Sequence, residues 1–165
     1  MAVFYSAVEV IEMAIKTEEA GKLFYESVAR KTRQKNLKEL FQFLASEETK
    51  HKEVFTNLYQ LTKEKPEAIP YNWDEMNLYL KALSESRFFL GEDKAINLVK
   101  KAKTPKQALD YALGFERDTM LFYTEITNIV SEQNRELVNK IIAQEKNHIR
   151  QLQAMKENLK SKGNK

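Results

Sequence analysis

Four long segments of the chain repeat apolar residues at heptad spacing, and a glutamate interrupts each of the four repeats. The segments are expected as helices over residues 7–32, 37–63, 105–130 and 135–159. Heptad spacing keeps one face of each helix against its neighbours, which predicts four helices packed side by side. Only four glycines and three prolines occur in 165 residues, and this favours long helices over a turn-rich β fold. We therefore expect one all-α domain over residues 1–165, built as a four-helix bundle.

The connection between the second and third long helices, residues 64–104, is itself expected to be helical. The heptad pattern breaks at Pro66 and Pro70, and two short helices are expected over residues 73–90 and 92–101. A crossover of this length can run the full length of a bundle, so the second and third long helices should be parallel. Residues 161–165 are expected to fray. Capping boxes predict three helix starts, at Ser6–Glu9, Asn36–Glu39 and Thr104–Gln107.

Composition excludes several classes of protein. The chain has no cysteine, so disulfides, thiol catalysis, iron–sulfur clusters and cysteine-ligated zinc are ruled out. The net charge of +3 comes from 27 basic and 24 acidic residues spread along the chain, which argues against nucleic-acid binding. The longest run without charge, residues 54–62, is far shorter than the roughly 20 residues of a membrane helix. The first ten residues lack the basic start and cleavage site of a signal peptide, so a cytoplasmic location is expected by default.

The charged residues on the four apolar faces recur at a nearly constant offset. The surrounding strings agree as well, EEAGKLFY with ERDTMLFY and EETKH with QEKNH. The chain thus resembles two helical hairpins of common design, joined by the crossover. The recurring residues are Glu18 and Glu116 at an offset of 98, and Glu48–His51 and Glu145–His148 at an offset of 97.

These six residues predict a site for two metal ions. The i, i+3 spacing places the glutamate and histidine of each pair side by side on one helix face. Four buried glutamates cannot all stay ionised in a dry core, because desolvation and mutual repulsion each cost several kcal/mol. Two divalent cations would neutralise them, and carboxylates with imidazoles suit iron, manganese or zinc. In the alternative reading, each Glu-x-x-His pair is a solvated surface pair. Glu19, Glu47 and Asp118 lie off the apolar faces and are expected to be solvated.

Two tyrosines and two small residues lie near the predicted ligands. Tyr25 and Tyr123 each follow a single glutamate by seven residues. They are either aromatic core residues or phenols that donate to a ligand carboxylate of another helix, in which case they are candidate catalytic residues. Gly21 and Thr119 follow the same glutamates by three residues. They either leave space above the metals or let the crossing helices pack closely.

Together these motifs resemble the rubrerythrin-like branch of the ferritin-like superfamily over nearly the whole chain. The motifs are E-x-x-G-x-x-F-Y at 18–25, E-E-x-x-H at 47–51, E-x-x-x-x-x-F-Y at 116–123 and Q-E-x-x-H at 144–148. The string YNWDEMNLYL in the crossover also resembles small stand-alone bacterial members described as di-iron carboxylate proteins. The resemblance implies a ferritin-like bundle with two irons. It assigns Glu18 and His51 to one iron, Glu116 and His148 to the other, and Glu48 and Glu145 to both as bridging ligands.

The resemblance also implies an oxidoreductase that reduces hydrogen peroxide or dioxygen. Full rubrerythrins carry a rubredoxin domain with four cysteines, and because this chain has no cysteine, its electrons are expected from a separate protein. They also carry a further glutamate where this chain has Thr119, which departs from the peroxidase pattern. A homodimer is compatible with the sequence.

Two other functions stay open at this point. One is an iron-binding protein whose purpose is the oxidation of Fe(II), and the other is a bundle that metals only stabilise. The long helical crossover argues against a storage cage, which needs a compact crossover on its outer surface.

Overall fold

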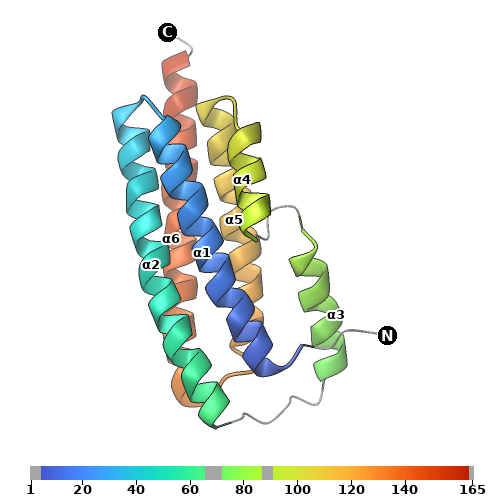
Figure 1. The fold of residues 1–165 in the computed structure, drawn as a ribbon. Coiled ribbons are helices and arrows are strands. Elements are labelled where there is room, and N and C mark those ends of the chain that lie inside the picture. Colours follow the sequence, from blue (N-terminus) through green and yellow to red (C-terminus); the bar gives the residue numbers. More distant parts are fainter. Residues whose placement is uncertain (1–4, 66–71, 87–90, 164–165) are drawn as a thin grey trace.

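Four long helices form a bundle in the computed structural model, which describes residues 5–65, 72–86 and 91–163. Within these residues there is no strand. The prediction of an all-α four-helix bundle with a helical crossover is confirmed (Figure 1). The long helices are α1 (Ala7–Lys31), α2 (Lys35–Glu64), α5 (Pro105–Ile126) and α6 (Glu132–Gly163).

The chain forms two antiparallel hairpins, α1 with α2 and α5 with α6 (Figure 1). The crossover carries α3 (Trp73–Ser84) and α4 (Glu92–Lys101) and returns the chain to the end of the bundle where α2 begins. As a result α2 and α5 run parallel, as the length of the crossover predicted. Along the way α3 packs against α5, and α4 packs against α1.

One of the three predicted capping boxes is complete, and a second is formed only in part. The Ser6 side chain accepts from the Glu9 N–H at 3.2 Å, and the Glu9 carboxylate accepts from the Ser6 N–H at 2.7 Å. Thr104 accepts from the Gln107 N–H at 3.2 Å. The Gln107 side chain accepts from the N–H of Lys103 at 2.9 Å, one residue earlier than a capping box requires.

The predicted box at Asn36–Glu39 is wrong, because α2 begins two residues earlier than expected. The Lys38 N–H already bonds to the Gln34 carbonyl at 3.0 Å, so Asn36 lies inside the helix. Gln34 occupies the N-cap position without a side-chain hydrogen bond. The start of α6 is also earlier than expected, because the Asn134 N–H donates to the hydroxyl of Ser131 at 3.4 Å.

Three helix ends differ from the prediction. Helix α5 ends at Ile126 rather than near residue 130, because the N–H groups of Asn128 and Ile129 bond three residues back in tight turns. Helix α3 ends at Ser84, and the next residues turn in the same way. The rest of the helix expected over 73–90 lies outside the described residues, as do Pro66 and Pro70. Helix α6 continues to Gly163, beyond the expected end at residue 159.

Two apolar clusters fill the bundle, one above and one below a layer of charged side chains. The upper cluster includes Tyr25, Phe41 and Leu152, and the lower one includes Phe55 and Tyr123. In every long helix the predicted metal ligands come between members of the two clusters. The six charged residues are therefore enclosed by apolar side chains along the bundle axis. No helix in the described part of the chain is long and apolar enough to span a membrane.

Candidate metal centre

The structure brings all six predicted ligands together in the layer between the two apolar clusters. Each is at most 1% exposed. They form two groups of four residues, and within each group the donor atoms lie within 4.8 Å of one another. Glu48 and Glu145 belong to both groups, which is the arrangement that two ions sharing two carboxylates require. The groups are Glu18, Glu48, His51 and Glu145, and Glu48, Glu116, Glu145 and His148.

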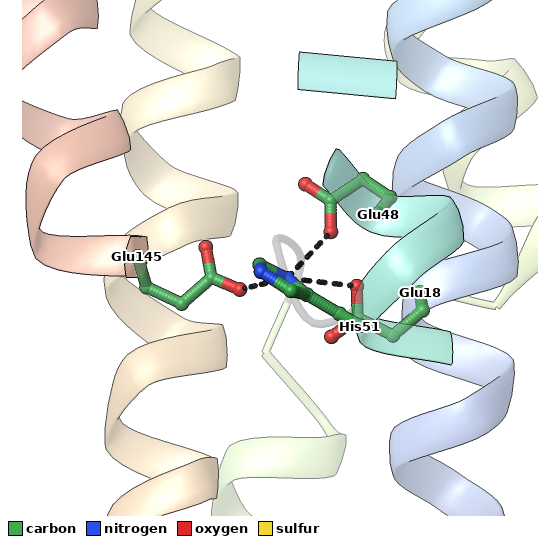
Figure 2. Close-up of side chains that lie close together, drawn as sticks. All are labelled: Glu18, Glu48, His51 and Glu145. Carbon is green, nitrogen blue, oxygen red and sulfur yellow. Dashed lines mark ion pairs between the residues drawn. The ribbon is translucent and has the colours of Figure 1, made fainter. Parts of the chain in front are cut away.

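Three carboxylates converge on one ring nitrogen of His51 (Figure 2). Its Nδ1 lies 2.9 Å from Glu145 Oε1 and 3.7 Å from an oxygen of both Glu18 and Glu48. These glutamates come from α1, α2 and α6, so three of the four long helices meet at this nitrogen.

His148 faces the other half of the cluster in the same way. Its Nδ1 lies 2.9 Å from Glu145 Oε2 and 3.6 Å from Glu116 Oε1. The two oxygens of Glu145 thus point at different histidines. The imidazole rings of His51 and His148 stack with centroids 5.6 Å apart and planes inclined by 22°. This geometry gives each half of the site one imidazole nitrogen and leaves Glu145 between them.

Gln144 orients the ring of His51. The Gln144 Oε1 atom lies 3.2 Å from His51 Nε2, and because an amide oxygen only accepts, Nε2 carries the proton. Nδ1, which faces the carboxylates, is then the nitrogen that would bind a metal once it gives up its own proton. This role of Gln144 was not predicted from the sequence, although Gln144 precedes Glu145 in the motif Q-E-x-x-H.

Glu47 is the counterpart of Gln144 in the first hairpin, and the expectation that it is solvated is wrong. It is 7% exposed, and its Oε1 lies 2.5 Å from the Lys50 ammonium, which compensates its burial. Glu19 is partly exposed and pairs with Lys52 at 2.6 Å. Asp118 is partly buried and accepts from the hydroxyl of Ser86.

The two tyrosines donate to ligand carboxylates across the bundle. Tyr25 on α1 donates to Glu116 Oε1 on α5, and Tyr123 on α5 donates to Glu18 Oε1 on α1. Both side chains are completely buried. Their rings also pack against α2, with centroids 5.9 Å from Phe41 for Tyr25 and 4.6 Å from Phe55 for Tyr123. Each tyrosine is therefore both a core residue and a hydrogen-bond donor, so the two interpretations do not exclude each other.

Burial dominates the electrostatics of the glutamates and tyrosines. It raises the pKa of Glu48 and Glu116 well above the ordinary value, and neighbouring carboxylates, Glu145 among them, raise the pKa of both further. Burial would also raise the pKa of Glu145, but its close contacts with Glu116 and with both histidines outweigh burial and lower that pKa. Burial and the nearby carboxylates raise the pKa of Tyr25 and Tyr123, so both phenols stay protonated donors.

Burial shifts the pKa of the two histidines in the opposite direction, because it disfavours their positive charge. Burial alone lowers the pKa of His148, but Glu116 and Glu145 raise it to about 10. Burial likewise opposes the charge on His51, and its three carboxylate neighbours raise the pKa well above the usual range. Without metal, the cluster therefore retains protons on both rings and on some of its carboxyls. Metal ions would take the place of these protons.

The cluster also contains buried polar atoms that lack a partner. Nine buried side-chain nitrogen or oxygen atoms in the described residues make no hydrogen bond, and six of them belong to the predicted ligands. Each such atom costs about 1–3 kcal/mol, so their concentration in one layer calls for an external partner. Carboxylate oxygens and imidazole nitrogens suit iron, manganese or zinc, and the residues present fit a pair of such ions. The six atoms are Glu18 Oε2, both oxygens of Glu48, His51 Nδ1, Glu116 Oε2 and Glu145 Oε1.

Gly21 and Thr119 differ in what surrounds them. A Cβ atom on Gly21 would lie 2.6 Å from Phe115 Cζ and 3.4 Å from the carboxyl carbon of Glu48. The ring of Phe115 thus occupies the space that the glycine leaves, which supports the packing reading for Gly21. Thr119 is completely buried, and its hydroxyl has no partner among the described residues.

Comparison with known proteins agrees with this arrangement. The family model described as Rubrerythrin matches residues 9–103, which is more than half of the chain. The matched stretch contains Glu18, Glu48, His51 and the crossover. The chain belongs to the rubrerythrin family. In this member of the family the second hairpin carries the same set of residue types through the internal repeat.

A solved structure extends the similarity through the second hairpin. It is a Thermotoga maritima protein described as a candidate ferritin-like diiron-carboxylate protein. The two chains are 28% identical, and their structures match with a TM-score of 0.69. The match covers 93% of this chain and 96% of the other. No curated protein matches the chain significantly. Family membership and the buried glutamate–histidine cluster together support a metal site of the di-iron carboxylate type.

Proposed function

We propose that this protein is a di-iron carboxylate oxidoreductase that reduces hydrogen peroxide or dioxygen with electrons from a separate donor protein. The observation that carries the proposal is the pair of four-residue groups that share Glu48 and Glu145. In this proposal Glu18 and His51 bind one iron, and the corresponding pair of the second hairpin, Glu116 and His148, binds the other. Glu48 and Glu145 bridge the two ions.

When bound, two ferrous ions would supply the two electrons that peroxide reduction needs, in the balance H₂O₂ + 2e⁻ + 2H⁺ → 2H₂O. The residues of the chain would bind the ions and hold protons at defined atoms. Gln144 keeps the proton of His51 on Nε2, away from the metals. Tyr25 and Tyr123 hold phenolic protons next to the terminal glutamates, where hydrogen bonding or proton transfer to a reacting oxygen is possible.

The burial of the site favours a small oxidant. All six proposed ligands are enclosed between apolar clusters, and such a site suits a molecule the size of peroxide or dioxygen better than a bulky organic substrate. The near symmetry of the site favours peroxide. Each half of the site has one histidine, so Glu18 with His51 and Glu116 with His148 would hold the two ions in similar surroundings.

Anaerobic loading with two Fe(II) per chain, followed by separate stopped-flow mixing with peroxide and with dioxygen, tests the proposal. We expect faster oxidation by peroxide. A dioxygen rate equal to or above the peroxide rate would instead indicate an oxidase or a protein that oxidises Fe(II) as its purpose. Sustained turnover with an external reductant separates these two. If the protein binds metal but reacts with neither peroxide nor dioxygen, the metals would only stabilise the bundle.

A further inference from the structure

Thr119 has a buried hydroxyl that does not use the acceptor normally available to it. In a helix, a threonine hydroxyl commonly bonds to the carbonyl four residues earlier. Thr119 is completely buried, yet its hydroxyl bonds neither to the Phe115 carbonyl nor to any other described group. Four other helical threonines of this chain do use that acceptor: Thr17 at 2.8 Å, Thr49 at 3.1 Å, Thr56 at 2.7 Å and Thr124 at 2.9 Å.

Thr119 lies on the same buried face of α5 as one of the proposed metal ligands. It lies one turn after Glu116 and one turn before Tyr123, on the face of α5 that points into the bundle. Glu116 is a proposed ligand of one iron, and Tyr123 donates to Glu18, a proposed ligand of the other. Thr62 is also buried with an unpartnered hydroxyl, but it lies three turns past His51, near the end of α2.

The internal repeat shows that the two sides of the metal pair are closed differently. The offset of 98 relates Gly21 to Thr119, and Thr17 to Phe115. On the Gly21 side the ring of Phe115 fills the space next to the carboxylate of Glu48. On the Thr119 side, Thr119 occupies the position that corresponds to Gly21, and Thr17 occupies the position that corresponds to Phe115. One side is therefore closed by an aromatic ring, and the other contains a hydroxyl without an acceptor.

We propose that small anionic or peroxide-type ligands bind the metal pair on the Thr119 side, and that the Thr119 hydroxyl donates a hydrogen bond to them. This inference rests on the metal pair of the proposed function. A buried hydroxyl next to a ligand that carries negative charge forms a hydrogen bond of the stronger, charge-assisted kind. The bound ligand would also supply the acceptor that the hydroxyl lacks in the protein.

Azide titration of the protein loaded with two Fe(III) tests this assignment without turnover. Azide stands in for the oxygen ligand, and its charge-transfer absorption gives the dissociation constant. Thr119→Val keeps the shape of the side chain and removes the hydroxyl, and it should weaken azide binding by about 10- to 100-fold. Thr119→Ser keeps the hydroxyl and should stay within about threefold of wild type. Thr62→Val, which removes the other unpartnered hydroxyl, is the matched control and should leave azide binding unchanged.

A second measurement separates a ligand contact from a structural role. Because the hydroxyl has no partner in the protein, Thr119→Val should not lower the melting temperature of the metal-free form. A lower melting temperature with unchanged azide affinity would overturn the proposal, as would equal affinities of the Val and Ser variants. If Thr119→Val does not fold, Thr119→Ala compared with Thr119→Ser answers the same question.

The outcome also distinguishes this inference from the proposed function. If the wild-type protein binds both metals but no azide, the proposed ligand site is wrong, whereas the metal centre is unaffected by this result. A protein that binds azide through Thr119 but reduces neither peroxide nor dioxygen overturns the proposed reaction alone.

Discussion

Tyr123 donates its phenolic hydrogen to Glu18, and the bond joins the third long helix of the bundle to the first. The reciprocal bond from Tyr25 to Glu116 joins the same two helices in the other direction. Each of these carboxylates therefore has one oxygen held by a phenol, while the second oxygen has no hydrogen bond within the protein.

Replacing the phenols should slow the reaction with peroxide. In Tyr25→Phe and Tyr123→Phe the ring packing on α2 is kept and only the donor is lost. If the phenols act as proton donors, each variant should oxidise about 10²-fold more slowly in anaerobic stopped-flow mixing with peroxide. Tyr79→Phe, on the exposed side of α3, is the control and should react at the wild-type rate. Unchanged rates in both buried variants would reduce the tyrosines to a packing role.

Removal of a histidine should affect one metal, whereas removal of a bridging glutamate should affect both. We expect His51→Ala and His148→Ala each to retain about one iron of two, because each imidazole faces one half of the cluster. Glu48→Ala and Glu145→Ala should lose the pair. Metal analysis after Fe(II) loading and desalting measures this, with the exposed Glu53→Ala as control. Equal losses in all four variants would contradict the assignment of terminal and bridging roles.

Gln144 should matter for metal affinity although it contacts no ligand oxygen. Gln144→Leu removes the acceptor of the His51 Nε2–H, so the proton is free to move to Nδ1 and compete with the metal. We expect about a tenfold loss of affinity at one of the two positions. Gln144→Glu keeps an acceptor and should retain the affinity. Isothermal titration with Co(II) would show the difference, and equal binding by both variants would argue against an orienting role.

Gly21→Ala should destabilise the protein in spite of the helix preference of alanine. The new Cβ would lie 2.6 Å from Phe115 Cζ, so the ring would have to move. Overpacking, partly offset by the gain in helix propensity, predicts a net loss of about 1–2 kcal/mol in the free energy of unfolding. Adding Phe115→Leu should relieve the clash, so that the double variant is more stable than the sum of the single effects. Urea unfolding of the metal-free proteins measures all three.

The metal-free protein should lose stability as the pH rises. The pKa values of Glu48 and Glu116 are raised above the ordinary 4.5, so the stability from their protonation is present below pH 4.5 and is lost as pH rises through the raised values. The pKa of His148 is raised from 6.5 to about 10, so its contribution is lost toward pH 10. The lowered pKa of Glu145 acts in the opposite direction, but only as pH falls below 4.5.

Bound metal should reverse this dependence, because ions require deprotonated ligands. The difference in melting temperature between loaded and chelator-treated protein should therefore widen between about pH 5 and pH 9. Thermal unfolding followed by circular dichroism at several pH values provides the measurement. A constant difference would indicate that the cluster does not exchange protons for metal.

The six proposed ligands were identified from the apolar periodicity, the internal repeat and the Glu-x-x-His spacing together. Glu18 and Glu116 fall on apolar faces, and a helix period leaves little freedom in where such residues point. The long crossover likewise predicted the parallel course of α2 and α5. Helix ends were less predictable, because several residues that can cap a helix lie within a few positions of one another. The hydroxyl of Ser131 starts α6 three residues earlier than the apolar pattern indicated.

The contacts around the ligands could not be predicted, because they depend on side chains from different helices. Gln144 orients the histidine of α2 from α6, a pairing 93 residues apart that no local pattern contains. The burial of Glu47 was missed for a similar reason, since its compensation by Lys50 depends on the conformations of both side chains. The choice between core and donor roles for Tyr25 required the position of Glu116 across the bundle.

The repeat of the two hairpins has a consequence for the origin of the site. One hairpin supplies two glutamates and one histidine, and two identical copies related by a twofold axis would supply the complete donor set. A symmetric dimer of hairpins could therefore have held the same site, and joining two copies into one chain would have required no new ligand. A single chain also allows corresponding positions to differ. Gly21 and Thr119, and likewise Glu47 and Gln144, are corresponding positions at which the two halves differ.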